Sequence, residues 1–221
     1  AMSTLSLTSA DQHRFQAYAA GDEKAERGLI VLQEIFGVNQ HIRNTCERFA
    51  EQGYRVLSPA LFDRQEKNVE LDYTAEDVQA GLALRNGIAQ DKTLLDIQAC
   101  VDALGSRKIG IVGYCWGGSL SWLAACRLQG LKAASCWYGS QIAQNAQEQP
   151  RIPVQMHFGA QDHSIPASAI QTIKDAQKDV AIYVYEPAGH GFGCDHRPDF
   201  HEASYKLAQE RTLAFFADHL R

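Results

Sequence analysis

Apolar stretches with the length of strands alternate along most of this chain with segments patterned like helices. The strand-like stretches fall at 29–33, 54–58, 109–113, 133–138, 153–158 and 181–185. Apolar residues recur at helical spacing near 40–52, 74–104, 116–129, 165–177 and 199–219. Strands joined by helices pair as parallel neighbours, and the helices cover both faces of the sheet. The alternation therefore predicts an α/β fold built on a mostly parallel, doubly wound sheet.

The 221 residues are enough to bury a sizeable core in one unit, and no repeat or Pro/Gly/Ser-rich stretch divides them. We therefore expect a single domain over residues 1–221. A formal charge of -5 argues against a nucleic-acid surface, and no apolar stretch is long enough to span a membrane. The six cysteines form no Cys-x-x-Cys pair, which favours free thiols in a reducing compartment. These features predict a cytoplasmic protein without nucleic-acid or membrane partners; they leave the oligomeric state open and are compatible with a monomer.

The stretch GYCWGG at 113–118 leads from a strand-like run directly into a helical one. In a nucleophile elbow, the central residue of Gly-x-nucleophile-x-Gly is held on a tight turn with its reactive atom exposed above the sheet. Cys115 is at the centre here, and the glycines at 113, 117 and 118 leave room for the crowded backbone of such a turn. The alternative interpretation is an inert buried cysteine beside glycines that allow close packing.

Polar side chains follow four of the predicted strands. They are Glu34 in VLQEIFGVN, Cys115, Asp162 in FGAQDHSIP and His190 in EPAGHGF. The carboxyl ends of parallel strands meet at one edge of a sheet, so we expect these side chains to lie together there. Taken singly, Asp162 could cap a helix, His190 could be a turn residue, and Glu34 could be a loop carboxylate. Taken together, the chain order of nucleophile, acid and histidine is the order found in α/β-hydrolases.

From about residue 28 to the C-terminus the chain resembles the dienelactone hydrolases, the cysteine-nucleophile branch of the α/β-hydrolase fold. The matching stretches are QEIFGVN, GYCWGGSL, GAQDHSIP, AGHGF and ERTLAFFADHL. This resemblance implies an α/β-hydrolase fold and an enzyme that hydrolyses small esters or lactones, with chemistry of the carboxymethylenebutenolidase type. The expected partner is such a small molecule, and no cofactor or metal is expected.

The residues themselves suggest how the reaction would proceed. A cysteine becomes a good nucleophile only as a thiolate, and His190 as base and the positive end of the following helix both favour that form of Cys115. Asp162 would hold the histidine in the correct tautomer. The backbone N–H of Trp116 would bind the oxyanion, and the resemblance implies a second donor at Ile35. An ester or lactone would then be cleaved through a Cys115 acyl-enzyme.

Glu34 has no place in a plain Cys-His-Asp triad. A carboxylate at the end of an apolar strand is desolvated, so we expect burial to raise its pKa. The resemblance implies that Glu34 interacts with the thiol in the resting enzyme and takes part in its activation once substrate is bound.

Substrate recognition departs from the family pattern. The resemblance implies two arginines that hold a substrate carboxylate, but the corresponding positions are Gln79 and Cys194. Neither side chain can match a carboxylate as a guanidinium does. Dienelactone itself is therefore in doubt as the natural substrate. The candidate substrate-binding residues that remain are Arg64, Arg85 and Arg197.

Three alternatives stay open on the sequence. Cys194, Asp195 and His196 are metal-ligand types, but no partner pair with ligand spacing accompanies them, so we expect no metal site. Cys115 could be the oxidisable thiol of a redox or peroxide-sensing protein, which would require a resolving cysteine nearby. The chain could also be a non-catalytic binding relative, although the presence of Cys115, Asp162 and His190 argues against that interpretation.

Overall fold

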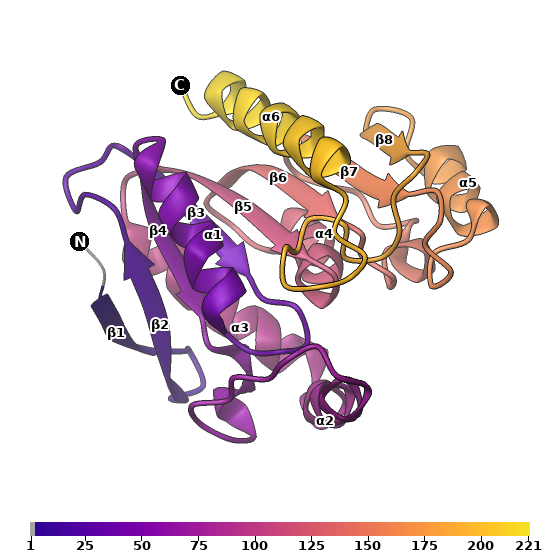
Figure 1. Cartoon of the computed structure of the whole chain (residues 1–221). Helices are drawn as coiled ribbons and strands as arrows, with labels where there is room; N and C mark the ends of the chain where they lie inside the picture. Colours follow the sequence, from indigo (N-terminus) through magenta and orange to yellow (C-terminus); the bar gives the residue numbers. More distant parts are fainter. Residues whose placement is uncertain (1–2) are drawn as a thin grey trace.

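A single sheet of eight strands forms the centre of the computed structural model, which describes residues 3–221 (Figure 1). Residues 1 and 2 of the predicted domain lie outside the described residues. The strands are β1 (Ser3–Thr8), β2 (Arg14–Ala20), β3 (Arg27–Leu32), β4 (Tyr54–Pro59), β5 (Lys108–Tyr114), β6 (Leu131–Trp137), β7 (Val154–Gly159) and β8 (Ala181–Tyr185). Their order across the sheet is β1-β2-β4-β3-β5-β6-β7-β8. β2 runs antiparallel to both β1 and β4, and all other neighbours are parallel. The predicted mostly parallel sheet is confirmed.

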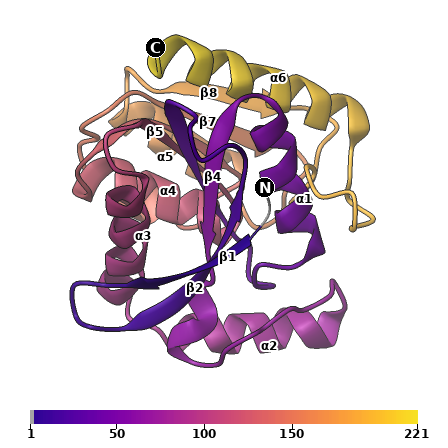
Figure 2. The same cartoon turned by 90° about the vertical axis from the view of Figure 1, so that its left-hand side faces the viewer.

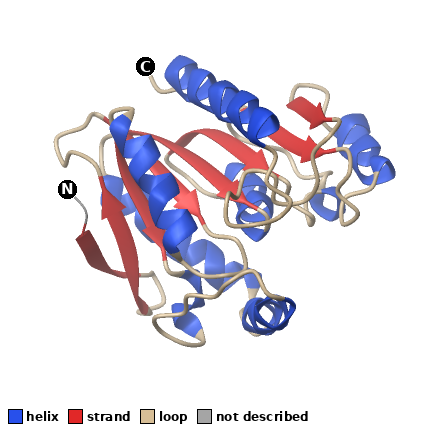
Figure 3. Cartoon of the chain, in the orientation of Figure 1, coloured by secondary structure: helices blue, strands red, loops and turns tan. Residues whose placement is uncertain are grey.

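Helices cover both faces of this sheet. They are α1 (Gln40–Glu51), α2 (Ala75–Asn86), α3 (Gln90–Leu104), α4 (Trp116–Arg127), α5 (Ala167–Ala176) and α6 (Glu202–His219), with short 3-10 turns η1 (Leu61–Arg64) and η2 (Ala143–Asn145). α1 and α6 lie on one face and α3 and α4 on the other (Figure 2), while α2 lies below the sheet in the view of Figure 3. This arrangement confirms the α/β-hydrolase fold class. No helix within residues 3–221 is both long and apolar enough to cross a membrane.

The structure differs from the sequence prediction at two places. Strands β1 and β2 were not predicted, although Phe15, Ala17 and Ala19 alternate with more exposed residues as in a strand with one buried face. The predicted helical segment 74–104 is two helices: α2 ends at Asn86 with Gly87 as its C-cap, and α3 begins at Gln90.

Pairing between the central strands determines which side chains can meet. β3 and β5 are in register as far as Leu32 and Gly113, and β5 and β6 as far as Tyr114 and Trp137. The segments that leave these strands therefore emerge side by side at the carboxyl edge of the sheet. All the residues of β3 after Arg27 are buried, as expected for a strand covered on both faces.

Candidate active site

Cys115 occupies the corner between β5 and α4 in a backbone conformation that non-glycine residues rarely adopt, with φ of 61°. The turn brings α4 very close to neighbouring strands. A Cβ on Gly117 would come within 2.5 Å of the carbonyl oxygens of Leu32 and Gln33, and one on Gly118 within 2.2 Å of that of Trp137. Only glycine fits at either position. This crowding gives the physical reason for the GYCWGG pattern, and it leaves the Cys115 side chain partly exposed at the corner.

Three of the predicted residues form a continuous chain of contacts. The Sγ of Cys115 lies 3.1 Å from Nε2 of His190, and Nδ1 of the same ring lies 2.6 Å from Oδ2 of Asp162. The other oxygen of Asp162 accepts hydrogen bonds from the backbone N–H and the hydroxyl of Ser164, at 2.9 and 2.6 Å. The Asp162 carboxylate is thereby fixed with one oxygen directed at the imidazole. It does not cap α5, whose N-cap is Pro166.

The electrostatics of these contacts favour a charged pair of Cys115 and His190. Burial opposes ionisation of the Cys115 thiol, but the neighbouring His190 and Arg197 outweigh it and bring the thiol pKa below its ordinary 9.0. Burial also acts against a charged His190, yet the Cys115 thiolate and Asp162 raise the imidazole pKa above its ordinary value. The site can therefore hold a thiolate next to an imidazolium.

Glu34 lies fully buried at the end of β3, and other side chains occupy both of its carboxylate oxygens. Tyr73 donates its hydroxyl to Oε1 at 2.7 Å, and Arg197 donates to Oε2 at 2.6 Å. Burial raises the pKa of Glu34, but Arg197, His41 and Tyr73 together more than offset it, so the pKa is lowered. The expected rise is therefore wrong, because these three partners were not visible in the sequence. The Cys115 thiol contacts His190 in this structure, whereas Glu34 contacts Tyr73 and Arg197.

The two predicted oxyanion donors lie on the chain segments that leave β3 and β5. Ile35 directly follows Glu34, and Trp116 directly follows Cys115 as the first residue of α4. A first-turn N–H has no carbonyl one turn earlier in its own helix to bind, so the Trp116 N–H can serve another acceptor. The Trp116 indole stacks on Phe62 with ring centres 5.5 Å apart, which fixes this side of the corner.

The three candidate arginines have different surroundings. Arg197 pairs with Glu34, as described above. Arg64 pairs with Asp11 at 2.9 Å and with the buried Asp96 at 2.8 Å, and this use of its guanidinium was not apparent from the sequence. Arg85 hydrogen-bonds the adjacent Asn86 and lines a cavity of about 200 Å³ together with Trp116. Arg85 and Arg197 are therefore beside other predicted site residues, whereas Arg64 is engaged in an ion-pair cluster.

Sequence analysis missed three side chains beside this site. Tyr73 and His41 act on Glu34. Tyr138 follows β6 with an unusual φ of 36°, and its ring lies edge-on to that of His190 with centres 5.3 Å apart. In the part of the chain that the structure describes, its buried hydroxyl has no hydrogen-bond partner. The position of Tyr138 at the end of a predicted strand was a signal that could have found it.

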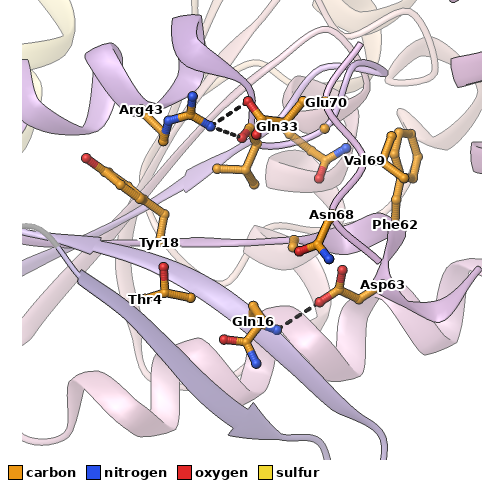
Figure 4. A pocket seen from close by; sticks show the side chains of 13 residues that line it. Thr4, Gln16, Tyr18, Gln33, Arg43, Phe62, Asp63, Asn68, Val69 and Glu70 are labelled. Carbon is orange, nitrogen blue, oxygen red and sulfur yellow. Dashed lines mark hydrogen bonds and ion pairs between the residues drawn. The ribbon is translucent and has the colours of Figure 1, made fainter. Parts of the chain in front are cut away.

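A separate cavity of about 150 Å³ lies between β2 and the segment that follows η1 (Figure 4). An ion pair between Arg43 and Glu70, 2.7 Å long, borders it, and on another side the backbone N–H of Gln16 donates to Asp63. Cys115, His190 and Asp162 are not among its lining residues. Gln33, which follows β3, and Phe62, which stacks on Trp116, both line it, so the cavity adjoins the outer side of the candidate site.

Residues 15–220 match the sequence profile described as the dienelactone hydrolase family. This chain belongs to that family. It is 32% identical over 225 residues to the carboxymethylenebutenolidase of Pseudomonas putida, covering 96% of this chain and 95% of that protein. An Escherichia coli K12 protein, assigned the same activity without proof, is 34% identical over 224 residues, covering 90% of this chain and 81% of its own.

A solved structure agrees with this membership. A Klebsiella pneumoniae protein, assigned as a dienelactone hydrolase without proof, has a TM-score of 0.85 and 31% identity, covering 98% of this chain and 99% of its own. As a member of the dienelactone hydrolase family with this fold, the chain is a carboxylic ester hydrolase.

Proposed function

We propose that this dienelactone hydrolase family member cleaves small esters or lactones through an acyl-enzyme on Cys115, with His190 and Asp162 completing a Cys-His-Asp triad. The observation that carries the proposal is the unbroken set of contacts from the Cys115 sulfur through both imidazole nitrogens to Asp162. Cys115 lies on an elbow with a positive φ, a backbone geometry that a buried structural cysteine would not require.

In the proposed reaction, the Cys115 thiolate attacks the carbonyl carbon of the substrate. The N–H groups of Trp116 and Ile35 stabilise the charge that develops on the carbonyl oxygen. His190 then gives a proton to the departing alkoxide, which remains tethered if the substrate is a lactone. In the second half, His190 takes a proton from water, and the resulting hydroxide releases the acid from Cys115. Asp162 keeps the imidazole oriented and stabilises its charged form.

We assign Glu34 a controlling role over this thiol. Its carboxylate is close enough to oppose ionisation of Cys115, while Arg197 favours it. The two opposing charges form one ion pair, so a substrate that shifts Arg197 or Glu34 would change the ionisation of the thiol. This is how the family role proposed for Glu34 could operate with the contacts present here.

For the substrate, we propose neutral small esters and lactones. Gln79 is exposed and uncharged, Cys194 is buried, and Arg197 is already paired with Glu34. A well-formed charge-assisted contact contributes about 1.5–3 kcal/mol, so loss of each family arginine corresponds to about one to two decades of affinity for a carboxylate. Neutral substrates have no carboxylate, so the absence of these arginines does not lower their affinity. We therefore expect their kcat/KM to equal or exceed that of dienelactone.

The test is turnover of p-nitrophenyl acetate by single variants. Cys115→Ala removes the nucleophile and should abolish turnover, and Cys115→Ser should retain little, because a hydroxyl needs stronger deprotonation than a thiol. His190→Ala removes the base. Asp162→Asn should lower kcat strongly, since the equivalent change in a serine triad costs about 10⁴-fold. Cys126→Ala, at a buried thiol on α4, is the matched control and should keep its activity. Near wild-type turnover by Cys115→Ala would contradict the proposed mechanism.

A further inference from the structure

A second group of metal-ligand side chains lies beside Glu34, where α1 meets the loop of residues 186–201 between β8 and α6. His41 comes from the first turn of α1, and Cys194 and His196 come from the loop. One potential ligand atom from each of the three lies within 4.8 Å of the others. The sequence grouping Cys194 and His196 thereby gains the partner that spacing did not reveal, since His41 is about 150 residues away along the chain.

His41 is the member that points to a ligand. It is only 2% exposed, and among residues 3–221 neither of its ring nitrogens has a hydrogen-bond partner. The Oδ1 atom of Asp195 lies 3.7 Å from Nδ1, beyond hydrogen-bond distance. An imidazole buried without partners is costly, because it has given up its bonds to water without replacing them. A bound cation would satisfy one of these nitrogens.

Asp195 positions the exposed member of the group. Its Oδ1 lies 2.9 Å from Nδ1 of His196, so the carboxylate can take the proton-bearing nitrogen and leave Nε2 free. A carboxylate that orients a histidine through its second nitrogen is the usual support around a bound metal ion. Asp195 also accepts from Arg48 of α1 at 3.4 Å, which already links the loop to the helix.

We propose that His41, Cys194 and His196 bind one Zn²⁺ ion, leaving a fourth position open, and that the ion fastens the 186–201 loop to α1. Two imidazoles and one thiolate form a donor set that suits zinc, whereas hard cations prefer oxygen ligands. Zinc bond lengths of about 2.0–2.3 Å place tetrahedral ligand atoms roughly 3.4–3.7 Å apart. The group must therefore contract by about 1 Å, which rotation of His196 can supply because that side chain is 39% exposed. On binding, the Cys194 thiol releases its proton to solvent and ligates as thiolate.

The first test is a metal titration of the full, reduced chain after removal of metals with a chelator. We expect one Co²⁺ per chain with a thiolate-to-cobalt charge-transfer band in the near ultraviolet, displaced by Zn²⁺. Cys194→Ser should abolish the band and weaken Zn²⁺ binding at least tenfold, and His196→Ala should weaken it similarly. His219→Ala, at a partly exposed histidine on α6, is the matched control and should bind like the wild type.

Cys115 with His190 is another place where zinc could be held, and the variants separate the two sites. The proposal predicts that Cys115→Ser keeps the cobalt band and the Zn²⁺ affinity. A band lost in Cys115→Ser but kept in Cys194→Ser would overturn it, as would Zn²⁺ binding no tighter than millimolar in the wild type.

Hydrogen exchange tests the fastening of the loop directly. Zn²⁺ should slow amide exchange over residues 191–201 in the wild type and in Cys115→Ser, and it should not do so in His196→Ala. Exchange in this loop that Zn²⁺ leaves unchanged in the wild type would overturn the fastening.

Discussion

Glu34 is a buried carboxylate whose charge opposes ionisation of the Cys115 thiol, and Arg197 opposes Glu34 in turn. Iodoacetamide reacts only with the thiolate, so the alkylation rate rises with pH and its midpoint reports the thiol pKa. In the wild type that midpoint should lie below 9.0. Glu34→Gln removes a negative charge near the thiolate, so we expect the midpoint to move to lower pH. Measuring alkylation rate against pH for both proteins checks this expectation.

Glu148→Gln is the matched control for this experiment, because it also removes the carboxylate partner of an arginine, Arg127, at 2.7 Å on the surface. Its profile should coincide with that of the wild type. If the Glu34→Gln profile also coincided, Glu34 would have no part in controlling the thiol. A thermal melt of each variant is needed alongside. Glu34→Gln leaves the buried Arg197 without its carboxylate partner, and such a loss commonly costs about 3–5 kcal/mol.

The hydroxyl of Tyr138 is buried beside His190, and within residues 3–221 it has no hydrogen-bond partner. A buried polar group without a partner costs about 1–3 kcal/mol. Tyr138→Phe should therefore leave the melting temperature unchanged or raise it. If the hydroxyl serves a bound substrate, kcat/KM for p-nitrophenyl acetate should fall in the same variant. A clear loss of stability would show that the hydroxyl has a structural partner after all.

At the level of single elements, the strands and helices that carry the candidate site were predictable from the sequence. The side chains that surround Glu34 and Cys194 were not. β5 and α4 follow from an apolar run, three glycines and helical spacing, all of which are local signals. The hydrogen bond of Arg197 to Glu34 and the proximity of His41 to Cys194 both depend on how the 186–201 loop packs against α1. No local sequence pattern encodes that packing. β1 and β2 carry a period-two alternation that was present in the sequence but passed over.

Arg85 of α2 lines a cavity together with Trp116, the residue that follows the proposed nucleophile. Arg85 carries no ion pair within the described part of the chain, so it is available to a substrate carboxylate. Arg85→Ala should raise KM for an anionic lactone by about one decade and leave a neutral ester unaffected. Arg151→Ala, at an exposed arginine, is the control. Equal effects of Arg85→Ala on both substrates would exclude Arg85 as a carboxylate-binding residue.

Across the whole molecule, Arg64 ties the turn between β1 and β2 to η1 and α3. It pairs with Asp11 in that turn and with the buried Asp96 of α3, which also accepts from Ser9 at 2.5 Å. Arg64→Met would leave the buried carboxylate of Asp96 without its guanidinium partner, so we expect a loss of about 3–5 kcal/mol of unfolding free energy. Urea denaturation measures this loss. Turnover per folded molecule should stay unchanged; a selective loss of kcat/KM without destabilisation would restore Arg64 as a substrate-binding residue.

The central claim is that this family member forms a covalent acyl-enzyme on Cys115. The most direct measurement is mass spectrometry of the wild-type protein quenched with acid during turnover of p-nitrophenyl acetate, followed by peptide mapping. The account predicts one acetyl group per chain, located on Cys115. Turnover that proceeds with Cys115 free of acetyl, or with the acetyl on another residue, would contradict the account and return Cys115 to the redox alternative.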